Sequence, residues 1–124
     1  TADARGVEER IVRRAPGLLR TAGRTPDLAV LAAVLQAADL AIANDTGPMH
    51  LAAGVGTPLL ALFGATDPVV SAPLGAGPRR LLYEPEPCSP CFRRTCVVHG
   101  HPCLTRFGVE RVLREALNLH ERTA

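Results

Sequence analysis

Residues 39–64, DLAIANDTGPMHLAAGVGTPLLALFG, decide the fold of this chain. They contain two aliphatic runs, in 39–44 and 56–64, and between them a stretch of small residues that starts with Pro48. Strands that are buried on both faces of a parallel sheet have this continuous aliphatic character. Proline at the first helical position is typical of a helix start. The stretch therefore predicts a buried strand over 39–44, a short helix over 48–55 and a second strand over 56–64.

The rest of the chain continues this alternation of helix and strand. Working outward, the sequence predicts a helix over 1–15, a strand over 17–23, a helix over 24–39, a third strand over 79–84 and a closing helix over 108–120. Residues 65–78 have the composition of a loop, and 84–105 hold Pro and Cys without a period. The predicted fold class is α/β, with a Rossmann-like parallel sheet and flanking helices.

Two of the predicted helices carry signals at their starts or on their faces. For the helix over 24–39 we expect Thr25 as the N-cap, Pro26 at the first helical position and Asp27 at the positive end of the helix dipole. Its apolar residues recur at helical spacing: Leu28, Leu31, Leu35 and Ala38. The closing helix is expected to turn five residues inward: Val109, Val112, Leu113, Ala116 and Leu117.

The composition is that of a folded protein. The chain has 124 residues, 47% of them apolar and 3% aromatic, which predicts a single domain over 1–124 with an aliphatic core. The net charge of +2 gives no indication of a nucleic-acid partner, and Arg79 and Arg80 are expected to be solvated. No apolar run approaches the about 20 residues of a membrane span, and the first residues do not resemble a signal peptide, so we expect a cytoplasmic protein. An α/β domain seldom opens on a helix, so we expect a preceding strand and a longer polypeptide.

The turn after the first buried strand is a candidate anion site. It consists of six consecutive residues: Asp45, Thr46, Gly47, Pro48, Met49 and His50. Ligands of open parallel sheets gather at the carboxyl ends of strands, where helix N-termini point. The N–H groups around Thr46, Gly47 and Met49, with the Thr46 hydroxyl, are expected to be open to an anion. Gly47 is expected to let the turn bend sharply and a ligand approach closely, and His50 to add a donor or a positive charge.

A structural interpretation of the same turn is also possible. A carboxylate repels phosphate, so Asp45 is expected to cap backbone N–H groups or to accept a hydrogen bond from a sugar hydroxyl. On spacing alone, an N-cap at Asp45 or Thr46 with His50 on the surface has about equal weight. A second loop after Gly64, over 65–68, favours the anion site, because adjacent strands would bring both loops to one crevice. The two loops together predict a nucleoside-diphosphate site.

Residues 44–68, NDTGPMHLAAGVGTPLLALFGATDP, resemble the signature of the heptosyltransferases of glycosyltransferase family 9. The family pattern is an Asp-[Ser/Thr]-Gly-Pro-Met-His run, a Gly-[Thr/Val]-Pro, an aliphatic strand and Phe-Gly-x-Thr-x-Pro. The chain carries these elements in this order. The upstream segment 22–43 resembles the helix and strand that lead to the family's loop, and the downstream segment 87–104 resembles its Cys-rich segment. The resemblance covers about residues 21–120.

The resemblance implies the C-terminal, donor-binding half of a GT-B enzyme, which has two Rossmann-like halves with the active site between them. The donor, typically ADP-heptose, would place its diphosphate on the backbone at Thr46 and Gly47, beside Asp45 and His50. The acceptor would be the lipid-linked inner core of lipopolysaccharide, at the inner face of the inner membrane. The general base is implied to be an Asp of the N-terminal half. We therefore expect no catalytic residue in this chain, no required cofactor and no activity without the other half.

Four cysteines offer an alternative function. Cys88, Cys91, Cys96 and Cys103 have the spacing C-x2-C-x4-C-x6-C, with two histidines between the last two. Such a set could hold one Zn²⁺, which would make 88–103 a small zinc-binding interaction module. The other interpretation is a structural loop of reduced or partly paired cysteines, which is favoured because three prolines within 87–104 stiffen the loop and the His-x4-Cys ending of a zinc knuckle is absent. The transferase is preferred to the zinc module as a function, because the module leaves the signature at 44–50 unexplained.

Overall fold

The computed structural model describes residues 2–15, 17 and 27–123. The chain divides into two compact units, Thr1–Leu31 and Ala32–Ala124. The first unit contains α1, Ala2–Arg14, where the sequence predicts a helix. The predicted strand over 17–23 lies outside the described residues, apart from position 17, which is in a turn.

Helix α2, Leu28–Gln36, begins later than the sequence predicts. The Asp27 carboxylate accepts a hydrogen bond from the Val30 amide at 2.8 Å, and the Asp27 carbonyl accepts one from the Leu31 amide at 3.2 Å. These contacts make Asp27 the N-cap, so the prediction of Thr25 for that position is wrong; Thr25 itself is outside the described residues. A carboxylate caps the amide and also interacts favourably with the positive end of the dipole.

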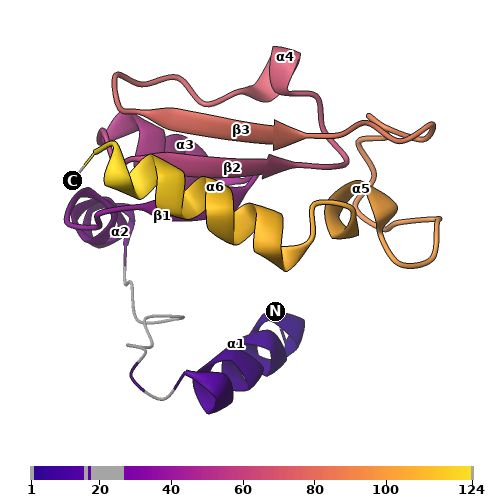
Figure 1. Ribbon diagram of the computed structural model, residues 1–124, viewed down its shortest axis with the longest axis horizontal. Helices are drawn as coiled ribbons and strands as arrows, with labels where there is room; N and C mark the ends of the chain where they lie inside the picture. Colours follow the sequence, from indigo (N-terminus) through magenta and orange to yellow (C-terminus); the bar gives the residue numbers. More distant parts are fainter. Residues whose placement is uncertain (1, 16, 18–26, 124) are drawn as a thin grey trace. The chain divides into compact units, whose positions relative to one another are not determined.

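Three parallel strands form the sheet: β1 (Ala41–Asn44), β2 (Leu59–Phe63) and β3 (Arg79–Tyr83), in that order (Figure 1). Ala41 pairs with Leu59, and Leu59 pairs with Arg79. All three strands coincide in position with sequence predictions, and the α/β class is confirmed. The expectation that the first of them is buried is wrong, because the residues of β1 alternate between half-buried and exposed, and Ile42 is 53% exposed.

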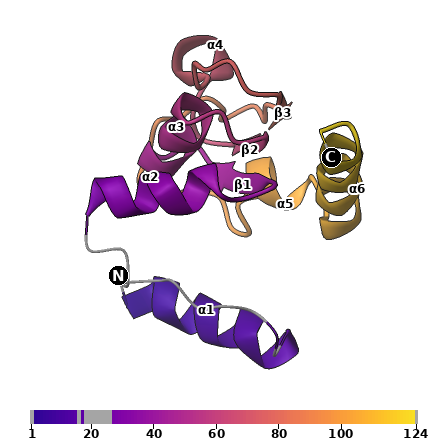
Figure 2. The same ribbon diagram turned by 90° about the vertical axis from the view of Figure 1, so that its left-hand side faces the viewer.

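Helices cover both faces of this sheet. Figure 2 shows α3 (Gly47–Gly54) and α6 (Val109–Glu121) on opposite sides of the strands. One core cluster lies on the α3 side: Met49, Ala52, Ala53, Leu59, Ala61 and Phe63. The other lies on the α6 side: Leu60, Leu82, Phe107, Ala116 and Leu119. Successive residues of β2 thus alternate between the two clusters, which is why its sequence is a continuous aliphatic run.

Helix α6 presents a different stripe to the sheet from the one predicted. Ala116 and Leu119 are buried, and Val112 packs against their cluster. Val109, Leu113 and Leu117, which were expected to point inward, are exposed over 77%, 56% and 50% of their surfaces. The contact follows positions i, i+4 and i+7, whereas the apolar stripe of the sequence is wider than this single line of contact.

The connection from β2 to β3 runs close to the end of α3. It contains one helical turn, α4 (Pro68–Ser71), within a segment predicted to be a loop. A Cβ atom on Gly75 would lie 2.0 Å from the Ala53 carbonyl oxygen, and one on Gly77 would lie 2.6 Å from the Gly56 carbonyl oxygen. Glycine is therefore required at both positions by close backbone approach, and this fixes the path into β3.

A second short helix, α5 (Pro102–Thr105), precedes α6 within the segment predicted to lack regular structure. No helix among the described residues is long and apolar enough to span a membrane.

Candidate functional site

The candidate site is the junction at which β1 ends and α3 begins, at the carboxyl edge of the sheet (Figure 1). Thr46 is the N-cap of α3, with an extended backbone (φ −154°, ψ 166°). Its side chain does not cap the helix, because the hydroxyl donates to the Asn44 carbonyl at 3.1 Å. Pro48 stands in the first turn, as predicted, where its missing N–H costs no intrahelical hydrogen bond.

Only part of the predicted set of amides is open. The Thr46 carbonyl accepts hydrogen bonds from the Met49 amide at 3.0 Å and from the His50 amide at 3.4 Å. The Met49 side chain is completely buried in the core. Met49 therefore holds the helix against the sheet, and the expectation that its amide is open is wrong. The N–H groups of Thr46 and Gly47 donate to no acceptor within the described part of the chain, so two adjacent amides remain for a ligand.

Gly47 leaves free space beside these amides. A Cβ atom at this position would meet no heavy atom within 4 Å, and the backbone does not have the positive φ that favours glycine. The turn therefore does not require glycine for its shape, in contrast to the expectation that Gly47 allows a sharp bend. What the missing side chain leaves is empty space at the Cβ position of an exposed residue.

Asp45 connects this turn to the loop after β2. Its Oδ2 accepts a hydrogen bond from the Ser71 hydroxyl at 2.7 Å, and its Oδ1 lies 3.7 Å from Nε2 of His50. The carboxylate is only 15% exposed, whereas the imidazole is 49% exposed. The expected cap between Asp45 and a backbone amide is absent from the described residues, and the carboxylate orients a hydroxyl and an imidazole instead. Ser71 was not identified from the sequence, since only the fold brings it to Asp45.

The second loop lies at the same edge, as predicted from the adjacency of the two strands. Asp67 caps α4 by accepting from the Val69 amide at 2.9 Å. Its carbonyl also lies 3.1 Å from the Ser71 hydroxyl, so Ser71 sits between Asp67 and Asp45. The loop after β2 is therefore ordered by its own cap and is held against the candidate site by one side chain.

The cysteine segment, residues 88–103, is hydrogen-bonded to the start of the same loop. The Phe92 amide donates to the Ala65 carbonyl at 2.8 Å, and the Ser89 hydroxyl donates to the Gly64 carbonyl at 3.1 Å. All four cysteines are free thiols. Burial raises the pKa of the Cys103 thiol, and the neighbouring thiols of the other three cysteines raise it further.

The structure does not support the zinc module. Within the described residues, no three His, Cys, Asp or Glu side chains are grouped so that they could hold a metal ion. Cys88, Cys91 and Cys96 do line a common hollow of about 330 Å³. Cys103, however, is buried in the turn of α5, where it packs next to the position of Gly64. Cys103 does not line the hollow of the other three cysteines, and the spacing in the sequence could not reveal this, because it depends on how α5 packs.

Comparison with known proteins gives the family of this chain. The family model described as glycosyltransferase family 9 (heptosyltransferase) matches residues 1–101. The chain belongs to glycosyltransferase family 9. The match includes the β1–α3 junction, the loop after β2 and three of the four cysteines; Cys103 follows the last matched residue.

Curated relatives carry heptosyltransferase names. The chain is 36% identical over 81 residues to lipooligosaccharide heptosyltransferase 2 of Campylobacter jejuni, a match that covers 65% of this chain and 25% of the relative. It is 41% identical over 90 residues to lipopolysaccharide heptosyltransferase 1 of Pseudomonas aeruginosa, with 71% and 25% covered. It is 49% identical over 43 residues to lipopolysaccharide heptosyltransferase 3 of Escherichia coli, with 35% and 13% covered. No solved structure matches the chain.

The matched part spans about a quarter of the first two of these relatives. Family membership therefore accounts for the fold and for the loops at its carboxyl edge.

Proposed function

We propose that this chain is the donor-binding part of a glycosyltransferase that moves a heptose-type sugar from a nucleoside diphosphate, with ADP-heptose as the expected donor, to the inner core of lipopolysaccharide. The observation that carries the proposal is the pair of open amides at Thr46 and Gly47, with empty space beside Gly47. Helix N-termini bind phosphate through such N–H groups and through the positive end of the helix dipole.

The same amides would assist the chemical step. When the sugar is transferred, the bond between the anomeric carbon and the diphosphate breaks and negative charge grows on the departing phosphate. Donors already aimed at that oxygen stabilise the transition state more than the ground state. His50 lies one turn into α3 with its imidazole half exposed, where it can donate to a second phosphate oxygen.

Asp45 has a positioning role in this proposal. Its carboxylate holds the Ser71 hydroxyl and the His50 imidazole, so it keeps two donors on one side of the turn. The remaining carboxylate lone pairs can accept a hydroxyl of the donor sugar or ribose. Met49 contributes by packing, since its side chain is buried and its amide is bonded within the turn.

The base that takes a proton from the acceptor hydroxyl is proposed to lie in another part of the polypeptide, in an N-terminal acceptor-binding half. The lipid-linked acceptor places the enzyme in the cytoplasm, at the inner face of the inner membrane. Neither part of the reaction as proposed requires a metal or another cofactor.

The test is ADP binding, followed by heptose transfer from ADP-heptose to lipopolysaccharide that lacks heptose. The variants are Gly47→Val and Asp45→Ala, in the polypeptide that contains both halves. We expect Gly47→Val to abolish ADP binding and transfer, and Asp45→Ala to weaken both. A variant Gly54→Ala, at the other end of α3 and also in open space, is the matched control. If Gly47→Val binds ADP as the unmodified protein does, the amides are not the diphosphate site and the proposal fails.

A further inference from the structure

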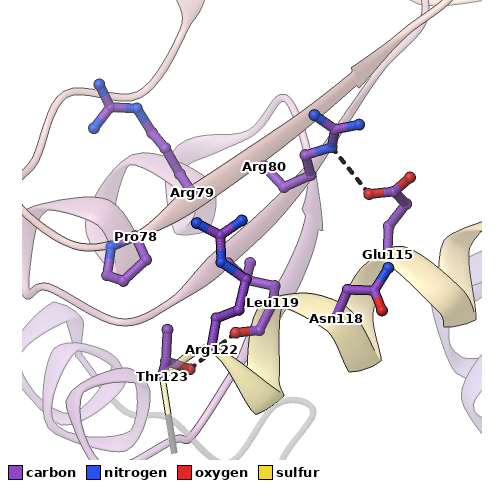
Figure 3. Close-up of a pocket in the computed structure, with 8 residues that line it drawn as sticks. All are labelled: Pro78, Arg79, Arg80, Glu115, Asn118, Leu119, Arg122 and Thr123. Carbon is purple, nitrogen blue, oxygen red and sulfur yellow. Dashed lines mark hydrogen bonds and ion pairs between the residues drawn. The ribbon is translucent and has the colours of Figure 1, made fainter.

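A hollow of about 650 Å³ lies at the opposite edge of the sheet, between the start of β3 and the last turns of α6 (Figure 3). Because the strands are parallel, this amino edge is the far side of the sheet from the N-terminus of α3. Three arginines line the hollow, Arg79, Arg80 and Arg122, together with one acidic residue, Glu115. The volume is within the range of about 300–1,000 Å³ that is typical of small-molecule sites.

The arginines are not fully neutralised. Arg80 Nε lies 3.0 Å from Glu115 Oε2, and this ion pair uses the single carboxylate of the hollow. Arg79 Nη1 donates to the Gly75 carbonyl at 2.8 Å, which is a neutral acceptor. The Arg122 side chain has no hydrogen bond or ion pair with another residue of the described chain. Of the two guanidinium groups without a counter-charge from the described residues, Arg122 is directed into the hollow, whereas the Arg79 guanidinium points away from Arg80 and Arg122 in Figure 3.

Arg122 is the arginine whose charge is most available to a ligand in this hollow. In Figure 3 the Arg122 guanidinium group points toward the start of β3 and lies between Arg79 and Arg80 in this view, while Glu115 reaches only Arg80. Pro78 and the buried Leu119 provide an apolar wall. Arg79 and Arg80 are exposed, as the sequence predicted, and Arg122 is exposed as well. Their side chains nevertheless line a concave surface, and concave walls concentrate the field of like charges.

The end of α6 would oppose an anion if its last carbonyls were open. Thr123 reduces this effect, because its hydroxyl donates to the Leu119 carbonyl at 3.1 Å and to the His120 carbonyl at 3.0 Å. Its amide also donates to the His120 carbonyl, at 3.0 Å. The last turn therefore carries partly satisfied carbonyls and the cationic Arg122.

We propose that this hollow is a second anion site, which binds a phosphate group at Arg122, with the positive charge of Arg79 at its margin. Guanidinium groups match phosphate oxygens with paired N–H donors, so a phosphomonoester or a phosphodiester is the ligand chemistry that fits. The phosphate belongs either to a soluble molecule or to an anionic phospholipid headgroup. The site is independent of the donor site, since it lies at the other edge of the sheet.

The experiment compares the double variant Arg79→Gln/Arg122→Gln with the control Arg94→Gln/Arg114→Gln in the polypeptide that carries this chain. The control removes the same charge from exposed positions outside the hollow. One arm titrates sodium pyrophosphate at low ionic strength and follows the amide NMR signals of 79–80 and 119–123, which report on the hollow. The signals of 46–47 are followed separately, because they report on the donor site. The other arm measures co-sedimentation with vesicles of phosphatidylglycerol and phosphatidylcholine, against pure phosphatidylcholine.

We expect the hollow variant to lose affinity by about tenfold or more in one arm, while the control changes by less than about twofold. Loss in the pyrophosphate arm identifies a soluble phosphate ligand, and loss only in the vesicle arm identifies a lipid headgroup. Signals of 46–47 should respond to pyrophosphate equally in both variants, which separates this site from the donor site. If the hollow variant and the control behave alike in both arms, the proposal is overturned.

Discussion

Replacing Gly47 with alanine should separate ligand binding from folding. The added methyl group would meet no heavy atom within 4 Å, and the backbone there does not have a positive φ. A glycine-to-alanine change at such a compatible position stabilises a protein by about 0.4–1 kcal/mol, chiefly because the unfolded chain has fewer conformations to lose. We therefore expect the free energy of unfolding of Gly47→Ala to be unchanged or slightly higher.

The same methyl group should weaken the binding of ADP. It would occupy the space through which a phosphate oxygen must come within about 2.7–3.2 Å of the open amides. A hydrogen bond to a charged acceptor contributes about 1.5–3 kcal/mol. Loss of one such bond reduces ADP affinity by about 10- to 150-fold. The structure thus predicts that stability and affinity change in opposite directions.

Isothermal titration calorimetry with ADP measures the affinity, and urea unfolding measures the stability. Gly54→Ala is the control, because that glycine is in the same helix and also has nothing within 4 Å of a Cβ position. It should raise stability and leave ADP affinity alone. Gly47→Ala protein that binds ADP as tightly as the unmodified protein would refute the assignment of the open amides. A loss of more than about 1 kcal/mol of stability would refute the geometry at Gly47.

Three further changes test other parts of the structure. Ser71→Ala removes the hydroxyl that donates to Asp45, so we expect a loss of about 1–2 kcal/mol in urea unfolding together with weaker ADP binding, and unchanged values would contradict the bridge. Gly75→Ala places a methyl group 2.0 Å from the Ala53 carbonyl oxygen and should destabilise the protein by about 1–3 kcal/mol or more; an unchanged unfolding midpoint would show that the loop takes another path. Because its pKa is raised above the ordinary value of 9.0, Cys103 stays protonated at a pH that ionises an unperturbed thiol. Iodoacetamide at pH 9 should therefore modify Cys103 more slowly than the exposed Cys88, as mass spectrometry of peptides can show, and stability should fall as the pH rises through the folded-state pKa.

The sequence was most informative where local pattern and burial coincide. The run 39–64 predicted β1, α3 and β2 in the right order, because parallel strands carry aliphatic runs and a proline marks the helix start. The burial that the run also predicted is found in β2 and not in β1. The adjacency of β1 and β2 followed, and with it the presence of two loops at one edge. Membership in the family was also predictable, since the signature over 44–68 lies within the matched residues.

What could not be predicted depends on contacts between distant residues. Ser71 reaches Asp45 across 26 positions of sequence, and no local pattern indicates such a pair. The hydrogen bond from the Met49 amide to the Thr46 carbonyl makes that amide unavailable to a ligand. It depends on the dihedral angles of the turn, which the residue types do not determine. The face that α6 turns to the sheet is set by packing around Leu119, while the apolar stripe alone allows several rotations.

The close backbone contacts of Gly75 and Gly77 matter beyond the loop that contains them. Through them, the segment that leads into β3 packs against the backbone at the end of α3, at Ala53 and Gly56. Met49, in the first turn of the same helix, packs in the core. Because contacts hold both ends of α3, the helix should not tilt when a ligand binds. The N–H groups of Thr46 and Gly47 then have the same orientation before and after binding. Whatever binds there must adapt its own shape, and little ordering entropy is left for the protein to lose. At the proposed donor site, selectivity among diphosphates should then depend mainly on the geometry of the bridging oxygen, with ligands of altered bridge length rejected even when their charge is the same.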